Sequence, residues 1–520
     1  MGNSSRVKNA IKNVGIAGGL QIFNLILNFV SRTYFVNLLG NDYLSCDGLF
    51  TNILTVLSFS ELGIGSAIVY SLYKPIAEDD KVQIGKLMNL FATAYRIIAV
   101  VISVCGVALI PFLGYLVDDV PDVKESITLL YLLFLGNTVA SYIFGYKRSY
   151  LMANQENYIV VLVHQGFNTL KIAAQILLLY WTHNYILYLI ITIVSTLLTN
   201  VVSTAITNNK YPWMNKYKKN KLTKDERKPI FSNIAAIFNY KLGSVILTGT
   251  SNIIISLILK TAYVGLVSNY NLVISAVQVV VGQIQNGLQG TVGNFNVTAD
   301  EERKHTIFHQ LFFISFWLIG FITIGLAVML TDFVGTVWLN TDYIVSYDVV
   351  IALCLSFYFL MINTVPSIYR TTLGIFKEAR MCPIYASIIN IILAVVLGKT
   401  IGLSGVFFAT AIARLLTFNL MDPYFVYKKA FGKNVKGFYI RFIKYFLVLV
   451  VAYIATAFVA DFIQVEGFWS FILKGIVVTV VCNALFLLFF FRTEMFRESI
   501  QLVCNMSIIK KFKIKLKKRS

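Results

Sequence analysis

Polar side chains recur at helical spacing inside the first long apolar stretch of the sequence. Gln21, Asn24, Asn28 and Arg32 fall three, four and four residues apart, which places them on one face of a helix. An arginine at the bilayer centre costs roughly 2.5–3.5 kcal/mol on insertion scales, so it is found mostly where it faces a bundle interior or a watery cavity. We interpret this face as part of the wall of a transport pathway.

Three further apolar stretches carry a polar face of the same kind. The acidic residues Asp47 and Glu61 lie on the face of the second stretch, and Lys241 lies on that of the seventh. The remaining polar residues that we predict to line a cavity are Thr51, Thr55, Ser244, Thr248, Ser275, Gln278 and Gln285. These stretches open each half of the chain, so we expect them to face each other across a cavity at the membrane midplane.

Basic residues outnumber acidic residues inside the apolar stretches. Arg32, Arg96, Lys171, Lys241 and Arg414 stand against Asp47 and Glu61. Such an excess attracts an anion, and phosphate in particular, because arginine binds it bidentately and lysine binds it as a point charge. We predict that these five residues bind an anionic head group.

Each embedded charge also has a structural interpretation. Arg32 and Asp47 lie at similar depth on consecutive helices and could form an ion pair, and Glu61 could pair with Arg148 or Lys171. Arg96 could extend to the interface, and Arg414 could be paired structurally. Asp47, Glu61 and His164 remain candidates for coupling or gating, although a membrane histidine more often bonds a neighbouring helix.

Composition identifies the elements that would position these residues. The 520 residues are 57% hydrophobic and 13% charged, with a mean hydropathy of +0.72, which is typical of an all-α polytopic membrane protein. We predict about fourteen transmembrane helices: 15–39, 44–72, 89–113, 127–145, 158–180, 185–206, 232–258, 262–289, 308–331, 347–365, 383–399, 403–427, 443–461 and 470–491.

Lysine and arginine set the expected orientation. They gather in alternate loops and at both ends of the chain, whereas the intervening loops hold only Lys124, Lys260 and Lys399. The positive-inside rule then places both termini in the cytoplasm. The net charge of +20 reflects this orientation rather than nucleic-acid binding.

The two halves of the chain repeat. Arg148-Ser-Tyr-Leu151 with Glu156 recurs 222 residues later as Arg370-Thr-Thr-Leu373 with Glu378, and the matched segments cross in the same direction. We predict two parallel six-helix lobes around a central cavity. The expected parts are an N-lobe at 1–207, a basic linker at 208–231, a C-lobe at 232–427, and two further helices with a basic tail at 428–520.

Several segments resemble the polysaccharide (O-antigen and capsule repeat-unit) flippases of the multidrug/oligosaccharidyl-lipid/polysaccharide (MOP) exporter superfamily. They are Arg32–Tyr43, Gly48–Phe50, Ser60–Ala67, Leu72–Pro75, Ala153–Tyr158, Val267–Tyr270 and Trp338–Asn340. The resemblance implies a lipid-linked oligosaccharide substrate on undecaprenyl diphosphate, moved between leaflets by alternating access. Ser251 stands where many members carry an acid, so the coupling role of that acid does not carry over.

We therefore predict a flippase of the cytoplasmic membrane that serves polysaccharide biosynthesis. Membrane lipids and polysaccharide assembly proteins are the expected partners. No P-loop, GxSxG or HExxH motif and no metal or cofactor motif is present, so we do not expect an enzyme. The alternatives are a cation-coupled multidrug or metabolite antiporter of the same fold, a membrane glycosyltransferase or polymerase, and a scaffold for an assembly complex.

Overall fold

The computed structural model describes an all-helical chain. The described residues are 23–58 except 25, 71–116 except 74 and 77, 123–154 except 144, 156–217, 246–298 except 248, 300–375 and 378–505, with 222–223, 226–227 and 230. The chain divides into two compact units, Met1–Ser268 (unit 1) and Asn269–Ser520 (unit 2). This division falls later than the expected linker at 208–231, because residues preceding Ser268 pack within unit 1; the four expected parts stay predictions.

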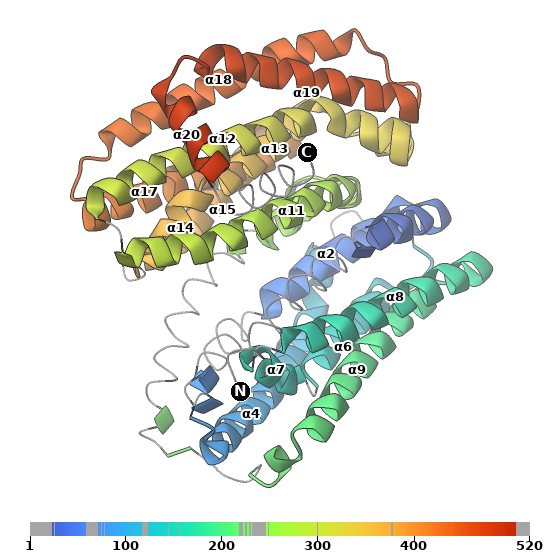
Figure 1. The fold of residues 1–520 in the computed structure, drawn as a ribbon. Helices are drawn as coiled ribbons and strands as arrows, with labels where there is room; N and C mark the ends of the chain where they lie inside the picture. Colours follow the sequence, from blue (N-terminus) through green and yellow to red (C-terminus); the bar gives the residue numbers. More distant parts are fainter. Residues whose placement is uncertain are drawn as a thin grey trace, which may run out of the picture. The chain divides into compact units, whose positions relative to one another are not determined.

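Unit 1 is a bundle of long helices and short connecting turns (Figure 1). Residues 26–39 are helical, and so is Gly249–Ile258. The other elements are α2 (Asn41–Leu57), α4 (Lys81–Ala108), η2 (Ile110–Phe112), α5 (Leu113–Leu116), α6 (Ile127–Tyr142), η3 (Gly145–Lys147), α7 (Arg148–Ala153), α8 (Asn157–Thr182), α9 (Tyr185–Lys210) and η4 (Pro212–Asn215).

Unit 2 begins inside α11 (Ala262–Thr298). Its other elements are α12 (Glu301–Asp332), η5 (Phe333–Trp338), η6 (Thr341–Tyr343), α13 (Tyr347–Ile362), α14 (Thr364–Thr372), η7 (Ala379–Met381), α15 (Cys382–Ile401), α16 (Leu403–Arg414), η8 (Leu415–Asn419), α17 (Leu420–Val426), η9 (Tyr427–Phe431), α18 (Lys436–Asp461), α19 (Phe468–Phe490) and α20 (Glu494–Asn505). The helices α18 and α19 pack together and against α12 (Figure 1).

Local sequence explains where the long helices begin and end. Asp80, Asn184 and Asp300 precede α4, α9 and α12, and each side chain accepts a hydrogen bond from a backbone N–H of the first turn. Such N-caps satisfy donors that a helix leaves unpaired. At the end of α8, His183 adopts a left-handed conformation with φ of 50°, which stops the helix and lets α9 return beside it.

Nine helices of the described residues are long and apolar enough to cross a membrane, and a tenth span results if α6 with η3 and α7, bent by 44°, counts as one. They correspond to ten of the fourteen expected spans, and the chain is a multi-pass membrane protein. The four other expected spans are 15–39, 44–72, 158–180 and 232–258, and all but 158–180 lie partly outside the described residues. The span at 158–180 is α8, a 26-residue helix, and its polar residues His164, Asn168, Lys171 and Gln175 lower its mean hydropathy.

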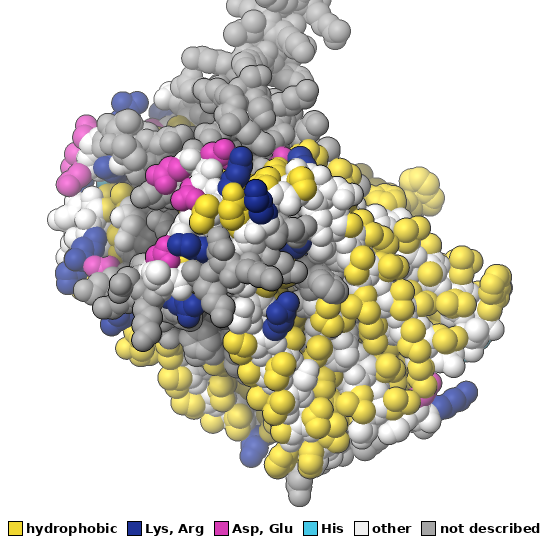
Figure 2. Space-filling model, turned by 90° about the horizontal axis from the view of Figure 1, so that it is seen from below, with side chains coloured by type: hydrophobic (Ala, Val, Ile, Leu, Met, Phe, Trp, Pro, Cys, Tyr) yellow, Lys and Arg dark blue, Asp and Glu magenta, His cyan; other side chains and the backbone are white. Residues whose placement is uncertain are grey.

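The surface of the chain fits a lipid environment. Large hydrophobic side chains are exposed along α4, α8, α15, α18 and α19, and on the face seen in Figure 2 such side chains cover a broad continuous area. Charged side chains gather mainly toward one edge of that face. An exposed apolar area of this extent is expected where hydrocarbon rather than water surrounds the helices.

The core of unit 2 is aromatic. Phe308 stacks on Phe312, with ring centroids 6.4 Å apart, and Phe316 stacks on Tyr445 of α18 at 4.6 Å. Aromatic pairs of this kind add about 0.5–1.5 kcal/mol beyond the area they bury. The Phe316–Tyr445 pair joins α12 to α18.

The expected repeat stays a prediction, and the two spans that precede its arginines differ in shape. The fourth expected span bends by 44° between Tyr142 and Gly145, before Arg148. Its counterpart in unit 2, Tyr347–Thr372, is one continuous candidate span with a turn at Asn363, before Arg370. Two glutamates at matching positions pair with lysines, Glu156 with Lys210 at 2.7 Å and Glu378 with Lys429 at 3.3 Å.

Candidate functional site

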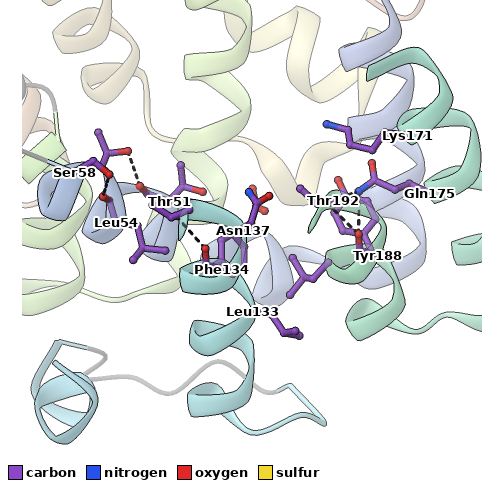
Figure 3. A pocket seen from close by; sticks show the side chains of 14 residues that line it. Thr51, Leu54, Ser58, Leu133, Phe134, Asn137, Lys171, Gln175, Tyr188 and Thr192 are labelled. Carbon is purple, nitrogen blue, oxygen red and sulfur yellow. Dashed lines mark hydrogen bonds between the residues drawn. The ribbon is translucent and has the colours of Figure 1, made fainter. Parts of the chain in front are cut away.

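A polar cavity of about 350 Å³ lies inside unit 1 between α2, α6, α8 and α9. We call it the Asp47 cavity. Figure 3 shows Lys171 and Gln175 of α8 on one side of it, and Thr51 of α2 and Ser58, which follows α2, on the other. The lining residues are Asp47, Thr51, Leu54, Thr55, Ser58, Leu133, Phe134, Asn137, Thr138, Lys171, Gln175, Tyr188, Leu189 and Thr192.

A second polar cavity of about 220 Å³, which we call the Arg148 cavity, shares two wall residues with the first. The shared residues are Lys171 and Thr192, so the two cavities adjoin along α8 and α9. The lining residues are Ser141, Arg148, His164, Asn168, Lys171, Thr192, Ser195, Thr196, Thr199 and Asn200. All of them are polar, which is uncommon for the interior of a membrane bundle.

Helical spacing of α8 brings its polar residues to these cavities. His164, Asn168, Lys171 and Gln175 follow one another at intervals of four, three and four, so they form one stripe. Gln175 donates to the carbonyl oxygen of Tyr188 at 3.1 Å and to Thr192 Oγ1 at 2.9 Å. These bonds fix α8 against α9 and leave the neighbouring Lys171 directed into the cavity (Figure 3).

The ammonium group of Lys171 has no hydrogen bond or ion pair to any residue that the structure describes. The nearest opposite charge is Asp47, whose carboxylate interacts electrostatically with both Arg32 and Lys171. One carboxylate therefore interacts with two cations, of which only Lys171 lines the Asp47 cavity. The expected Arg32–Asp47 ion pair is not found within 4 Å among the described residues, although the two groups attract each other.

The hydroxyl groups of α6 and α9 are held by their own helices. Thr138 donates to the carbonyl of Phe134 and Thr196 to that of Thr192, both at 3.0 Å. Thr196 also reaches Asn137 Oδ1 at 2.8 Å. Because these bonds satisfy the hydroxyl protons within the bundle, the oxygen lone pairs are what the cavity walls offer to a ligand or to water.

The structure brings together five of the residues expected at the site. Asp47, Thr51, Thr55, Lys171 and His164 line the two cavities. Asn24 is buried, and its Oδ1 accepts a hydrogen bond from Asn168 of the Arg148 cavity at 2.5 Å. Arg32 is half-buried, and Asn28 is exposed.

Other expected residues lie elsewhere or cannot be placed. Arg96 is exposed on α4, Ser275 is exposed and Gln278 half-buried on α11. Arg414 is buried in unit 2, where Nη1 donates to the carbonyl and hydroxyl oxygens of Ser356 at 2.7 and 2.8 Å. Gln21, Glu61, Lys241, Ser244, Thr248 and the side chain of Gln285 lie outside the described residues. Their roles stay predictions.

Sequence reasoning did not select several residues of this site. Arg148 was noted only for the repeat and as a possible partner of Glu61, and Asn137, Ser141, Thr192, Ser195, Thr196, Thr199 and Asn200 were not singled out. The available signal was the polar spacing of 192, 195, 196, 199 and 200 in the sixth expected span, which follows one face of a helix.

Comparison with solved structures identifies the fold. The chain is similar to an inward-facing multidrug resistance MATE family transporter of the MOP superfamily, with a TM-score of 0.61, 13% identity, and coverage of 79% of this chain and 97% of that one. It is similar to the lipid II flippase MurJ in an inward closed conformation, with a TM-score of 0.59, 18% identity, and coverage of 92% and 99%. For the Vibrio cholerae MATE transporter VcmN in the bent form, the TM-score is 0.53, the identity 15%, and the coverage 83% and 98%.

No curated protein sequence matches the chain. The model of the family described as polysaccharide biosynthesis protein matches residues 10–286, more than half of the sequence. This assignment confirms the family resemblance of the sequence. The chain therefore belongs to the polysaccharide biosynthesis protein family and has the helical fold of MOP superfamily transporters.

Proposed function

We propose that the chain is a flippase, which moves polyprenyl-diphosphate-linked oligosaccharide repeat units from the cytoplasmic to the outer leaflet. The main support for this proposal is the position of Lys171. Its cation is directed into a polar cavity and has no bonded partner among the described residues. A diphosphate supplies the missing negative charge, and hydroxyl and amide groups of the cavity walls suit the hydroxyls of a glycan. The family assignment supports the same class of cargo.

The proposal includes the orientation and the mechanism expected from the sequence. Both termini lie in the cytoplasm, and the two lobes expose the cargo site to each side in turn. Arg32 contributes further positive charge to the path, and so does Lys241, which lies outside the described residues. The polyprenyl tail stays in lipid, because no polar cavity would accept it.

Export of glycan by variants of Lys171 tests the proposal. Lys171→Gln should abolish transport of lipid-linked oligosaccharide into the outer leaflet of proteoliposomes, and Lys171→Arg should retain most of it because the charge remains. Lys399→Gln is the matched control, since Lys399 is exposed at the end of α15. Wild-type transport by Lys171→Gln, at equal amounts of folded protein, would refute the assignment.

A cation-coupled antiporter is the second candidate, and Asp47 is the observation that favours it. Its carboxylate lines a cavity together with Thr51, Thr55 and Asn137, and oxygen groups of this kind bind Na⁺ or carry a proton. In that case a Na⁺ or proton gradient should drive drug efflux from vesicles, and Asp47→Asn should stop it. Glycan-lipid transport without such efflux would exclude this candidate.

A further inference from the structure

The arginine of the Arg148 cavity has a counterpart in unit 2 with a different neighbour. Arg370 lies 222 residues later, and its Nε is 3.1 Å from Asp422 Oδ1. Both side chains are almost fully buried, with 4% and 1% exposed. Asn363 donates to the other carboxylate oxygen at 2.8 Å. Unit 2 therefore neutralises its repeated arginine with a carboxylate of its own.

The matching positions of unit 1 carry no carboxylate. Counting back 222 residues from Arg370, Asp422 and Asn363 gives Arg148, Asn200 and Ser141, and all three line the Arg148 cavity. The amide of Asn200 has the shape of the Asp422 carboxylate but not its charge.

Local contacts support the correspondence between the two arginines. Arg148 Nε donates to the carbonyl of Gly145 at 3.4 Å, and Arg370 Nη2 donates to Ser367 Oγ at 3.4 Å. Gly145 and Ser367 are themselves 222 residues apart. Each arginine thus contacts the residue three positions earlier in the chain.

The amide nitrogen of Asn200 is already used by the backbone. It donates to the carbonyl oxygens of Ala140, Ser141 and Ile143 at 3.1, 3.1 and 2.9 Å. These bonds tie α9 to the end of α6, where the helix leaves carbonyl groups unpaired. Asn200 therefore secures the wall of the cavity and adds nothing to balance Arg148.

The charge balance of the Arg148 cavity is positive. His164 experiences the positive charges of both Arg148 and Lys171, and no carboxylate belongs to the cavity lining that the structure describes. No carboxylate among the described residues lies within 4 Å of Arg148 either. The volume of about 220 Å³ corresponds to about seven waters, enough for a phosphoryl group and its nearest waters.

We propose that the Arg148 cavity is an oxyanion site, in which a phosphoryl group of the ligand takes the place that the Asp422 carboxylate fills in unit 2. Arg148 and Lys171 provide the charge and the N–H donors. The hydroxyl protons of Ser141 and Thr199 are donated to their own helices at 2.7 and 2.8 Å, so a bound phosphoryl group depends on the two cations. The assignment rests on the proposed function where the oxyanion is the diphosphate of the lipid-linked cargo. Free diphosphate is the other source of the same chemistry.

A single substitution can restore the balance seen in unit 2. Asn200→Asp adds a carboxylate to the cavity lining that contains Arg148, but it also removes the amide donations to Ala140, Ser141 and Ile143. Asn200→Ser, which loses the same donations without adding a charge, is therefore measured beside it, and only a loss of binding larger in Asn200→Asp than in Asn200→Ser supports the site. Asn209→Asp is the matched control, because it makes the same change at an exposed position of α9. Arg148→Gln is a second variant that removes the cation instead.

Binding of inorganic diphosphate and of geranyl diphosphate to the purified full chain is measured by titration calorimetry. Wild type and Asn209→Asp should bind, whereas Asn200→Asp and Arg148→Gln should lose about tenfold or more in affinity, as expected when a charged contact is removed or occupied. Equal affinity of wild type and Asn200→Asp would overturn the site. A further variant, Glu61→Gln, tests whether Glu61 is the counter-charge of Arg148. If wild type does not bind diphosphate and Glu61→Gln does, the proposed site is wrong and Glu61 neutralises Arg148 as Asp422 neutralises Arg370.

Glycan-lipid transport measured on the same variants separates the site from the function. If Asn200→Asp loses both geranyl diphosphate binding and glycan-lipid transport, the Arg148 cavity is supported as the site that binds the diphosphate of the cargo. Binding of inorganic diphosphate alone supports the oxyanion site and refutes its assignment to the cargo. If wild type binds diphosphate but transports no glycan, the flippase function is wrong and the oxyanion site stands. If wild type transports glycan and Asn200→Asp binds and transports like wild type, the flippase function stands and the oxyanion site is wrong.

Discussion

Arg370 and Asp422 form an ion pair in the interior of unit 2, with 3.1 Å between Nε and Oδ1. The matching arginine of unit 1, Arg148, faces a polar cavity instead. The two positions lie 222 residues apart and match in the expected repeat, so the same substitution at each compares an arginine with a counter-charge and one without.

Arg370→Met should lower the free energy of unfolding by about 3–5 kcal/mol, because it leaves the buried Asp422 without its partner. Arg148→Met should leave this free energy unchanged or raise it by up to about 1 kcal/mol, since it removes a cation that lies near Lys171 and His164. Thermal unfolding of both variants in one detergent measures the difference. Equal destabilisation would show that Arg148 also has a counter-charge in the protein.

Gly265 limits how closely α2 can approach the start of α11. A Cβ atom there would lie 2.5 Å from both Asn41 Oδ1 and Ser45 Oγ and 2.9 Å from the carbonyl oxygen of Asn41. Small residues allow such approach between membrane helices. Gly265→Ala should therefore cost about 1–3 kcal/mol of stability through overpacking.

Gly282 on the same helix is the control for this substitution. A Cβ atom at Gly282 meets nothing within 4 Å, so Gly282→Ala should be neutral or stabilise the helix by roughly 0.5–1 kcal/mol. We expect a lower melting temperature for Gly265→Ala than for Gly282→Ala. A stable Gly265→Ala protein would mean that α2 and α11 can move apart without loss.

The basic segment after α9 is attached to α4 by a pH-sensitive contact. Glu226 accepts the backbone N–H of Thr223 at 2.7 Å and pairs with Lys86 at 3.0 Å. The Thr223 hydrogen bond first, and Lys86 second, lower the pKa of Glu226 from 4.5 to about 2. The contact is fully present above pH 4.5 and is lost as the pH falls toward 2.

Cleavage by pepsin, which works in acid, should report this loss. Between pH 4.5 and 2, cutting near residues 218–230 should increase steeply in the wild type. Glu226→Gln should be cut readily over the whole interval, because its uncharged amide does not form the ion pair with Lys86 at any pH. A flat wild-type profile would contradict the attachment.

Glu156 secures the start of α8 to the end of α9. It is buried and accepts hydrogen bonds from Lys210 Nζ and Tyr211 Oη, both at 2.7 Å. Glu156→Gln should cost about 2–3 kcal/mol, because hydrogen bonds to a charged acceptor are lost in the interior. The matching Glu378 pairs with an exposed Lys429 at 3.3 Å, and Glu378→Gln should cost less than about 1 kcal/mol. Chemical denaturation of both variants checks the ranking.

The sequence predicts the helices well because their apolar lengths and polar spacing are local properties. Ten of the expected spans correspond to candidate spans in the structure, and the stripe containing Lys171 faces a cavity. What the sequence could not predict is which neighbouring helices complete that cavity. The contribution of α6 and α9 is made by serine and threonine, such as Thr196, which bond to their own helix and so resemble ordinary packing residues.

The role of Arg148 required the fold as well. In the sequence it lies beside Lys147 in a short basic break and resembles an interfacial residue. Only the bend between α6 and α7 turns it toward His164 and Asn200. The burial of Arg414 against Ser356 is a similar case, because hydropathy does not distinguish a cation that binds a ligand from one that binds a backbone carbonyl.

The difference between Arg148 and Arg370 predicts how many diphosphate groups one chain binds. Among the described residues, Arg370 is paired with the carboxylate of Asp422, whereas Arg148 lines a cavity. If a phosphoryl group pairs with Arg148, each polypeptide carries a single head group per cycle. Titration of the wild type should then saturate at one diphosphate per chain, and not at two as the repeated arginines alone would allow.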